Sequence, residues 1–221
     1  MKKSLMGLAV AVAVMPFYAQ ANYYGRSAYN ATPTMYLFGG VGAADYDLAS
    51  EDVRFSFGDG SLNRIEEDNQ SVSWRFGVGY RIADVLSFEF GYVDLGEFAA
   101  SAQSDGSRVG TNGYAPGRVD IDGESGGVFL GLNAHTPDEE PVGLYLRGGI
   151  YSWEVDGRVE DSSRSGRFLV DGVDPFIGGG LRFAIDRNIQ IQVGYDYYFI
   201  DDDEALDTAV GVLGADLVFY F

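Results

Sequence analysis

The last nine residues of the chain, 213–221, alternate between apolar side chains and mostly small or polar ones. In an extended strand one face carries Leu213, Ala215, Leu217, Phe219 and Phe221, and the other carries Gly214, Asp216, Val218 and Tyr220. Strict two-residue alternation predicts a half-buried β-strand. Because the second face holds an ionisable group and a glycine, we expect the apolar face to point outward. An apolar exterior around a polar interior is typical of a transmembrane β-barrel.

The first residues have the pattern of an export signal. Lys2 and Lys3 precede an apolar run that reaches Met15, and Ala19-Gln20-Ala21 follows. A basic start, a short apolar run and a small-residue cleavage site predict a secretory signal peptide. The alternative, a membrane-anchoring helix, needs roughly 20 apolar residues, more than this run provides. We therefore predict a signal peptide at residues 1–21 and one mature domain at residues 22–221.

Composition narrows the function classes. The formal net charge is −18, and removal of Lys2 and Lys3 makes it −20. Such acidity argues against nucleic acid as a partner, because binding there depends on neutralising phosphates with Lys and Arg. The chain has no cysteine, so we expect its stability to come from hydrogen-bonded strands and packing. Nothing in the composition indicates a cofactor or a resident metal.

Seven further segments repeat the alternation, which gives an even number of eight strands. Their approximate ranges are 35–43, 71–82, 86–92, 128–134, 144–151, 176–185 and 189–197. In the second, Val72, Trp74 and Phe76 alternate with residues that include Arg75. An arginine facing lipid at mid-depth costs about 2–4 kcal/mol, so Arg75 should point inward. The sequence predicts an all-β, eight-stranded antiparallel up-and-down transmembrane β-barrel over about residues 34–221.

The connections between these segments alternate in length. Residues 46–70, 94–127 and 153–173 are predicted as long polar loops, and a fourth contains the acidic run at 201–204. Within 94–127, an extension of a strand above the membrane at Val119 and Ile121 is left open. The intervening turns are short. Outer-membrane barrels have short periplasmic turns and longer extracellular loops, so we expect both termini in the periplasm of a Gram-negative bacterium. A soluble lipocalin-like barrel is the alternative, and it would reverse which residues face out.

The ordered fragments resemble a known family. They are 36–42 (Tyr-Leu-Phe-Gly-Gly-Val-Gly), 76–80 (Phe-Gly-Val-Gly-Tyr), 88–96 (Phe-Glu-Phe-Gly-Tyr-Val-Asp-Leu-Gly), 178–183 (Gly-Gly-Gly-Leu-Arg-Phe) and the terminal aromatic strand. Together they are similar to the small eight-stranded outer-membrane barrels of the outer membrane protein A and X type. The resemblance implies that Leu217, Phe219 and Phe221 form a signal for the barrel-assembly machinery. The sequence ends at the barrel, so we expect no peptidoglycan-binding domain.

Several charged residues are expected to form an ion network inside the barrel. They are Arg75, Glu89, Arg147, Arg182, Asp196 and Asp216. Buried charges are costly unless they are paired. The resemblance places Glu89 where protein A-type barrels have an acid in a switching salt bridge. Arg182 and Gln192 depart from the rest of that pattern, so we expect Glu89 to pair with Arg182.

The sequence leaves several functions open. We expect a monomeric structural or surface-interaction protein, with outer-membrane lipid and lipopolysaccharide as partners. An external partner at the loops is left open. The alternatives are a narrow channel for ions or small apolar solutes and a lipid-A-modifying enzyme. The single histidine, His135, lies on a predicted periplasmic turn, which disfavours the enzyme. The acidic runs at 66–68 and 201–204 lack calcium-loop spacing. Trp74, Tyr80, Tyr92, Tyr195 and Tyr197 are candidates for the interfacial aromatic belts.

Overall fold

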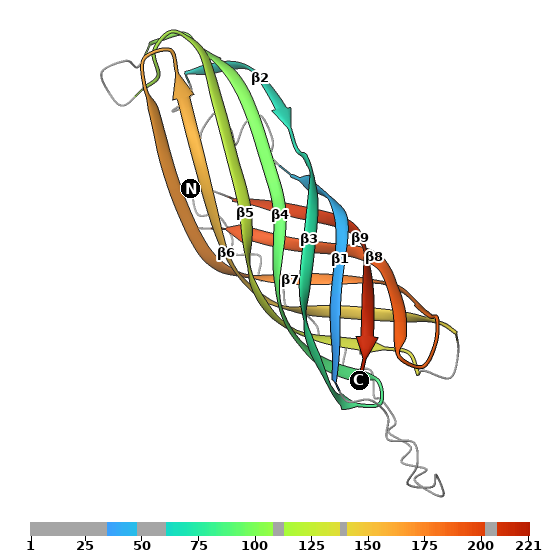
Figure 1. The fold of residues 1–221 in the computed structure, drawn as a ribbon. Coiled ribbons are helices and arrows are strands. Elements are labelled where there is room, and N and C mark those ends of the chain that lie inside the picture. Colours follow the sequence, from blue (N-terminus) through green and yellow to red (C-terminus); the bar gives the residue numbers. More distant parts are fainter. Residues whose placement is uncertain (1–34, 48–60, 108–112, 138–140, 202–206) are drawn as a thin grey trace, which may run out of the picture. The chain divides into compact units, whose positions relative to one another are not determined.

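The computed structural model describes residues 35–47, 61–107, 113–137, 141–201 and 207–221. Within them are nine β-strands, which Figure 1 shows in chain order: β1 (Met35–Tyr46), β2 (Leu62–Asp68), β3 (Gln70–Ala83), β4 (Leu86–Ser104), β5 (Gly117–His135), β6 (Val142–Asp161), β7 (Ser165–Ala184), β8 (Ile189–Asp201) and β9 (Asp207–Tyr220). No helix in this part of the chain is long and apolar enough to cross a membrane. The predicted signal peptide at 1–21 lies outside the described residues.

Eight of the strands form a closed antiparallel ring. The hydrogen-bonded order is β1-β3-β4-β5-β6-β7-β8-β9, and β9 pairs with β1 to close it. The remaining strand, β2, is not a ninth member of the ring. It pairs with residues 99–104 of β4, whereas β3 pairs with residues 86–94 of the same strand. β2 and β3 therefore form one interrupted side of the ring. The predicted eight-stranded up-and-down barrel is confirmed.

Side-chain exposure confirms the predicted orientation of the strands. Phe88 and Phe219 point outward with 40% and 47% of their surfaces exposed. Glu89, the neighbour of Phe88, points into the lumen and is 3% exposed. The same alternation follows every strand of the ring. An exposed belt of large apolar residues on a barrel suits hydrocarbon rather than water, so the lipocalin-like alternative is excluded.

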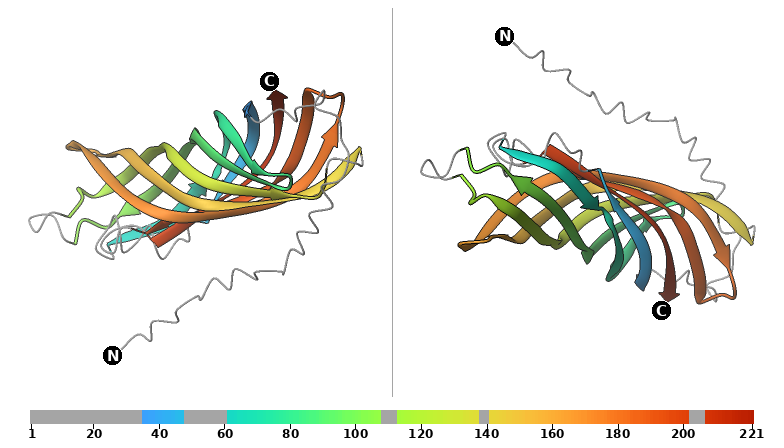
Figure 2. Two further views of the ribbon diagram at one scale, coloured as in Figure 1. Left: turned by 90° about the horizontal axis from the view of Figure 1, so that it is seen from below. Right: turned by 90° about the horizontal axis from the view of Figure 1, so that it is seen from above.

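The strands have two lengths, and this corrects the predicted loops. β1, β3, β8 and β9 contain 12 to 14 residues, whereas β4 to β7 contain 19 or 20. A membrane-spanning strand needs only about 9–11 residues. The segments 94–127 and 153–173, predicted as loops, are largely the continuations of β4–β7, and β2 lies in the predicted loop 46–70. These continuations and β2 form an extended sheet beyond the shorter strands (Figure 2).

Most of the extended sheet was missed because its outer face is polar, and only the extension at Val119 and Ile121, now part of β5, had been left open. Alternation continues there, with Val119 and Ile121 buried on the inner face and acidic residues outside. In β4 the parity also changes at a β-bulge between Asp94 and Gly96. Gly96 has a φ of 80°, a conformation that favours glycine. The sequence prediction looked for apolar residues facing lipid at every second position. It could not detect the parts of these strands that lie beyond the hydrocarbon.

Two apolar clusters fill the interior. The larger lies within the ring and contains Tyr36, Phe38, Phe129, Phe176, Trp153 and Tyr198 among others. The smaller belongs to the extended sheet, where Leu62, Ala100, Ala102, Val119 and Ile121 pack together. The extended sheet therefore has a core of its own.

Candidate functional site

Four of the six predicted interior charges meet in one cluster. Arg75 on β3 donates from Nε to Oδ1 of Asp216 at 2.6 Å and from Nη1 to Oδ2 of Asp196 at 2.8 Å. Arg147 on β6 donates from Nε to Oδ1 of Asp196 at 2.7 Å, and its Nη1 lies 3.6 Å from Oδ2 of Asp216. Each arginine therefore contacts both aspartates. We call Arg75, Arg147, Asp196 and Asp216 the lumen quartet.

Glycines on neighbouring strands make room for the lumen quartet. Gly40 pairs with both Arg75 and Asp216, and a Cβ at Gly40 would collide with the Asp216 carboxylate. Gly178 pairs with both Arg147 and Asp196, and a Cβ there would collide with the Asp196 carboxylate. Gly40 and Gly178 thus have specific positions beside the buried acids.

Burial makes the pairing of these charges essential. The side chains of Arg147, Asp196 and Asp216 are only 3–4% exposed, and that of Arg75 is 10% exposed. Taking a charge out of water costs several kcal/mol, and removal of one partner of a buried pair costs about 3–5 kcal/mol. Two positive and two negative charges in mutual contact balance one another. The quartet can therefore hold four strands together across the lumen.

Glu89 does not join the quartet. Its Oε1 accepts a hydrogen bond from the Tyr36 hydroxyl at 2.7 Å and another from Asn133 Nδ2 at 2.8 Å. Both partners are buried on the inner face, but the sequence analysis considered only charged residues as partners for this carboxylate. Reading the polar uncharged residues on the inner face together with the charged ones would have found them.

Arg182 also lies apart from the quartet, and the expected Glu89–Arg182 pair is wrong. Arg182 donates from Nη2 to the backbone carbonyls of Thr136 and Pro137, both at 2.6 Å. The prediction rested on where the two residues stand in the family pattern. Barrel strands are tilted and staggered, so such a pattern does not by itself bring side chains on β4 and β7 together.

The lumen beside the quartet is nearly filled. The cavity next to Arg75, Asp196 and Asp216 has a volume of about 10 Å³, at or below the least that holds one water. Aromatic rings occupy much of the remaining lumen: Phe129 lies 5.5 Å from Phe176, which lies 5.5 Å from Tyr198 between ring centroids. Among the described residues these rings and the quartet obstruct the axis of the barrel.

The outer face of the extended sheet is acidic. Its exposed carboxylates are Glu66, Asp68, Glu97, Asp122, Glu124, Glu154, Asp156, Glu160 and Asp171, and they outnumber its exposed arginines, Arg64, Arg118, Arg158 and Arg167. Arg158 forms an ion pair with Glu160 at 2.7 Å. Glu124 on β5 lies directly opposite Glu97 on β4 and Asp156 on β6. Like charges opposite each other destabilise a sheet, so a positively charged molecule would be favoured here. Where the chain is described, no group of three or more His, Cys, Asp or Glu side chains is arranged to hold a metal ion.

Asp161 stabilises the far end of the extended sheet. Its carboxylate accepts hydrogen bonds from the backbone amides of Ala115 at 3.0 Å, Ser163 at 2.7 Å and Arg164 at 2.9 Å. Burial raises the pKa of Asp161, but these hydrogen bonds outweigh it and hold the pKa well below its usual value. The carboxylate ties the β6–β7 hairpin to the chain before β5.

The β7 edge of the extended sheet has a partner on one side only. Residues 165–175 of β7 pair with β6, and the pairing of β7 with β8 starts at Phe176. Leu169 and Val173 on this segment are 61% and 63% exposed. Within the described chain, this edge presents backbone hydrogen-bonding groups and apolar side chains together.

The remaining predicted residues lie as follows. Leu217, Phe219 and Phe221 all face outward with 47–57% of their surfaces exposed. His135 ends β5, and its Nδ1 lies 2.9 Å from the carbonyl oxygen of Thr136. The acidic residues 66–68 belong to β2, and 202–204 lie outside the described residues. Trp74 stacks on Phe76 and contacts Tyr92 on the outer face.

Comparison with known proteins agrees with this geometry. Residues 30–221 match the family model described as "OmpA-like transmembrane domain". Outer membrane protein A of Klebsiella pneumoniae is 27% identical over 175 residues, which cover 76% of this chain and 45% of that protein. Outer membrane protein A of Salmonella typhi is 26% identical over 198 residues, which cover 89% of this chain and 48% of that protein.

The chain thus spans about half the length of these relatives. Among solved structures, the crystal structure of Neisserial surface protein A has a TM-score of 0.53 and 17% identity, covering 85% of this chain and 97% of the other. This likeness supports the eight-stranded fold. The match of the family model over nearly all of the described strands, together with the apolar exterior, assigns the chain to the outer membrane. The chain belongs to the OmpA-like transmembrane domain family.

Proposed function

We propose that this protein is a non-enzymatic surface protein of the outer membrane, whose barrel is a closed anchor and whose extended sheet contacts molecules outside the cell. The observation that carries the proposal is that only β4–β7 continue far past the ring, where they form a sheet with its own apolar core. A barrel that served only as an anchor would need none of these residues.

The orientation follows from the same asymmetry. The short turns β3–β4 and β7–β8 lie at the end of the ring where β1 begins and β9 ends. Short turns are periplasmic in outer-membrane barrels, so this proposal places the described ends, Met35 and Phe221, in the periplasm. The extended sheet then projects from the cell. We further propose that residues 1–21 are a cleaved signal, that the barrel is monomeric, and that outer-membrane lipid, lipopolysaccharide and the barrel-assembly machinery are its partners in the envelope.

The acidity of the sheet indicates the chemistry of an external partner. Opposed carboxylates such as Glu97 and Glu124 favour binding of a partner with a cationic surface. The β7 edge offers this partner apolar contacts at Leu169 and Val173. Complementary charge on two partners raises their association rate, and this effect becomes weaker as salt is added. A cationic polypeptide is therefore the partner class that this surface supports best.

Trimming the extended sheet tests the proposal. One variant replaces residues 97–124 and another 156–169 with two-residue Asn-Gly turns, which suit β-hairpins. Both should fold, as judged by heat-modifiable gel migration, and both should lose low-salt binding of a polylysine probe that the parent protein binds in vesicles. Binding that is equal in the parent and in the trimmed variants would overturn the proposal.

The second candidate, a narrow channel, is tested by planar-bilayer recording. The filled lumen beside the quartet supports a barrel that does not conduct ions. Discrete conductance steps from the folded, untrimmed barrel would favour the channel instead, and would require the quartet and the aromatic rings to move. For the enzyme, an unchanged lipid A mass in overexpressing cells is expected.

A further inference from the structure

Among the described strands, the extended sheet has two edges, and only one of them is regular. β2 forms one edge beside β4, and β7 forms the other beside β6. The pairing of β2 with β4 shifts in register between Asn63 and Glu66, and Arg64 has a φ of 53°. Such irregularities protect an edge from pairing with another strand. β7 pairs with β6 from Ser165 to Phe183 without a shift, so the edge of β7 can accept a further strand.

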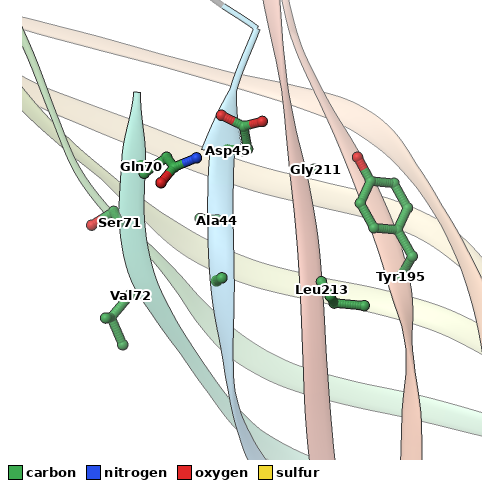
Figure 3. Close-up of a pocket in the computed structure, with 9 residues that line it drawn as sticks. Ala44, Asp45, Gln70, Ser71, Val72, Tyr195, Gly211 and Leu213 are labelled. Carbon is green, nitrogen blue, oxygen red and sulfur yellow. The ribbon is translucent and has the colours of Figure 1, made fainter. Parts of the chain in front are cut away.

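The ring leaves the open side of β7 free beyond its last row of pairs. The ladder between β7 and β8 begins at Phe176, and β1 ends near the same row, just past Asp45 (Figure 3). The end of β8 meets β7 once more, where the amide of Asp201 donates to the Asp174 carboxylate at 3.1 Å. Within the described chain, residues 165–172 therefore have β6 as their one neighbouring strand.

The backbone of β7 points every second residue toward this open side. In the β6–β7 hairpin the amide of Asp161 donates to the carbonyl of Arg164 at 2.9 Å, so these two residues form a hydrogen-bonded pair. Such pairs alternate with non-hydrogen-bonded pairs along an antiparallel ladder. Counting from Arg164, the odd-numbered residues of β7 form the non-hydrogen-bonded pairs with β6. The N–H and C=O groups of Arg167, Leu169 and Asp171 therefore point to the open side.

The side chains of the same three residues form a row that is complementary to itself. Leu169 is 61% exposed, and Arg167 and Asp171 are exposed on either side of it. A two-fold axis brings the same residues of two copies together. If two β7 strands pair antiparallel with Leu169 opposite its own copy, each Arg167 faces the Asp171 of the other strand. Opposite charges that face each other stabilise a strand pair.

Within one copy these two charges have unfavourable neighbours. Arg167 lies directly opposite Arg158 on β6. Asp171 lies directly opposite Glu154. Like charges opposite each other destabilise a strand pair. Arg167 and Asp171 are four residues apart, about 13 Å along a strand, which is too far for them to pair with each other. A second copy supplies the opposite charge that each of them needs.

We propose that the β7 edge is a contact between two copies of this chain, whose extended sheets join by antiparallel pairing centred on Leu169. Each hydrogen-bonded pair, Leu169 with Leu169 and Arg167 with Asp171, exchanges two hydrogen bonds. The two-fold axis of this pairing is perpendicular to the sheet and therefore reverses the barrel axis. The two barrels lie in membranes that face each other, and each remains a monomer in its own membrane. The contact rests on the proposed function, because the extended sheet must project from the cell.

Cysteine cross-linking in nanodiscs, which leave both membrane faces open to solution, tests the pairing and its register. The parent has no cysteine. Leu169→Cys should form a disulfide-linked dimer under mild oxidation, because the Cα atoms of a hydrogen-bonded pair lie about 5.5 Å apart, within the range of a disulfide. Val173→Cys is the matched control, since Val173 is 63% exposed on the same face. The pairing puts its two copies about 26 Å apart, so it should give at least about tenfold less dimer.

Charge reversal tests the ion pairs without a cysteine. Arg167→Asp and Asp171→Arg each put like charges opposite each other, and each should weaken the pairing of nanodiscs in analytical ultracentrifugation at least about tenfold. The double variant restores opposite charges and should pair as the parent does. Arg118→Asp and Asp122→Arg have the same spacing on the outer face of β5, which has neighbours on both sides. These controls should leave pairing unchanged. Heat-modifiable migration shows that each variant is folded.

The outcomes separate this contact from the proposed function. Parent nanodiscs that bind polylysine but do not pair would overturn the contact alone. Parent nanodiscs that pair through position 169 without binding polylysine would support the contact and count against the cationic partner. Equal cross-linking at positions 169 and 173, or a double charge variant that pairs no better than the single ones, would also overturn the contact.

Discussion

The lumen quartet should be essential to the stability of the barrel, and Asp196→Asn is the sharpest test. Asp196 accepts hydrogen bonds from Arg75 Nη1 at 2.8 Å and from Arg147 Nε at 2.7 Å, and its side chain is 4% exposed. Asparagine keeps the shape but removes the charge, so two guanidinium groups would share the single carboxylate of Asp216. Breaking a buried ion pair on one side costs about 3–5 kcal/mol.

Urea unfolding of the barrel in phospholipid vesicles, followed by tryptophan fluorescence, measures this loss. A decrease of about 3–5 kcal/mol is large beside the 5–15 kcal/mol typical of folded proteins, so the midpoint should fall clearly. Because buried pairs are screened less than exposed ones, the loss should persist at 1 M salt.

Glu89→Gln is the matched control for the same measurement. Glu89 accepts hydrogen bonds from the neutral groups of Tyr36 and Asn133, and a glutamine oxygen can accept both. We expect a loss of about 1 kcal/mol. The reasoning is refuted if Asp196→Asn lies within about 1 kcal/mol of the parent, or if Glu89→Gln costs as much as Asp196→Asn.

Three further predictions address other parts of the molecule. Gly178→Val should cost at least about 1–3 kcal/mol in the urea assay, because the new side chain displaces the Asp196 carboxylate; Gly166→Val, at a position with open space around the glycine, is the control. Because the pKa of Asp161 is lowered by folding, its contribution should be complete above its unfolded pKa of about 3.9 and decrease as pH falls through the lower folded value; Asp161→Asn should speed hydrogen exchange of the Ser163 amide at pH 6, and protection equal to the parent's would contradict this. Phe221→Ala should reduce the heat-modifiable fraction in the outer membrane if the terminal strand is an assembly signal, whereas Leu144→Ala, another outward residue, should not.

The sequence predicted the ring well because membrane energetics leaves little choice of parity. At Arg75 one face costs about 2–4 kcal/mol more than the other at mid-depth, and the neighbouring aromatic residues agree with that choice. The same logic fails beyond the hydrocarbon. There the outer face of a strand contacts water, so an outward Asp122 carries no energetic cost. The continuations of β4–β7 were therefore interpreted as loops, although their inner faces still alternate.

The membership of the ion cluster was less predictable than its presence. Parity placed all six charges inside, but pairing depends on the stagger between strands that are not neighbours. Arg75 on β3 reaches Asp196 on β8 across the lumen, a contact that no local pattern specifies. The glycines opposite the acids, Gly40 and Gly178, are a signal that sequence reasoning could have used once the register was known.

The lumen quartet also explains how the barrel can fix its register. A slip of one residue would turn every side chain of a strand to the opposite face and would place Arg75 or Arg147 in lipid. A slip of two residues keeps the parity but moves a side chain by roughly 6.6–6.8 Å along the strand, far enough to break hydrogen bonds of 2.6–2.8 Å. Apolar residues on the lipid face cannot make this distinction, because any even slip still leaves them in hydrocarbon. The buried charges therefore specify one register among those that the apolar exterior alone would allow.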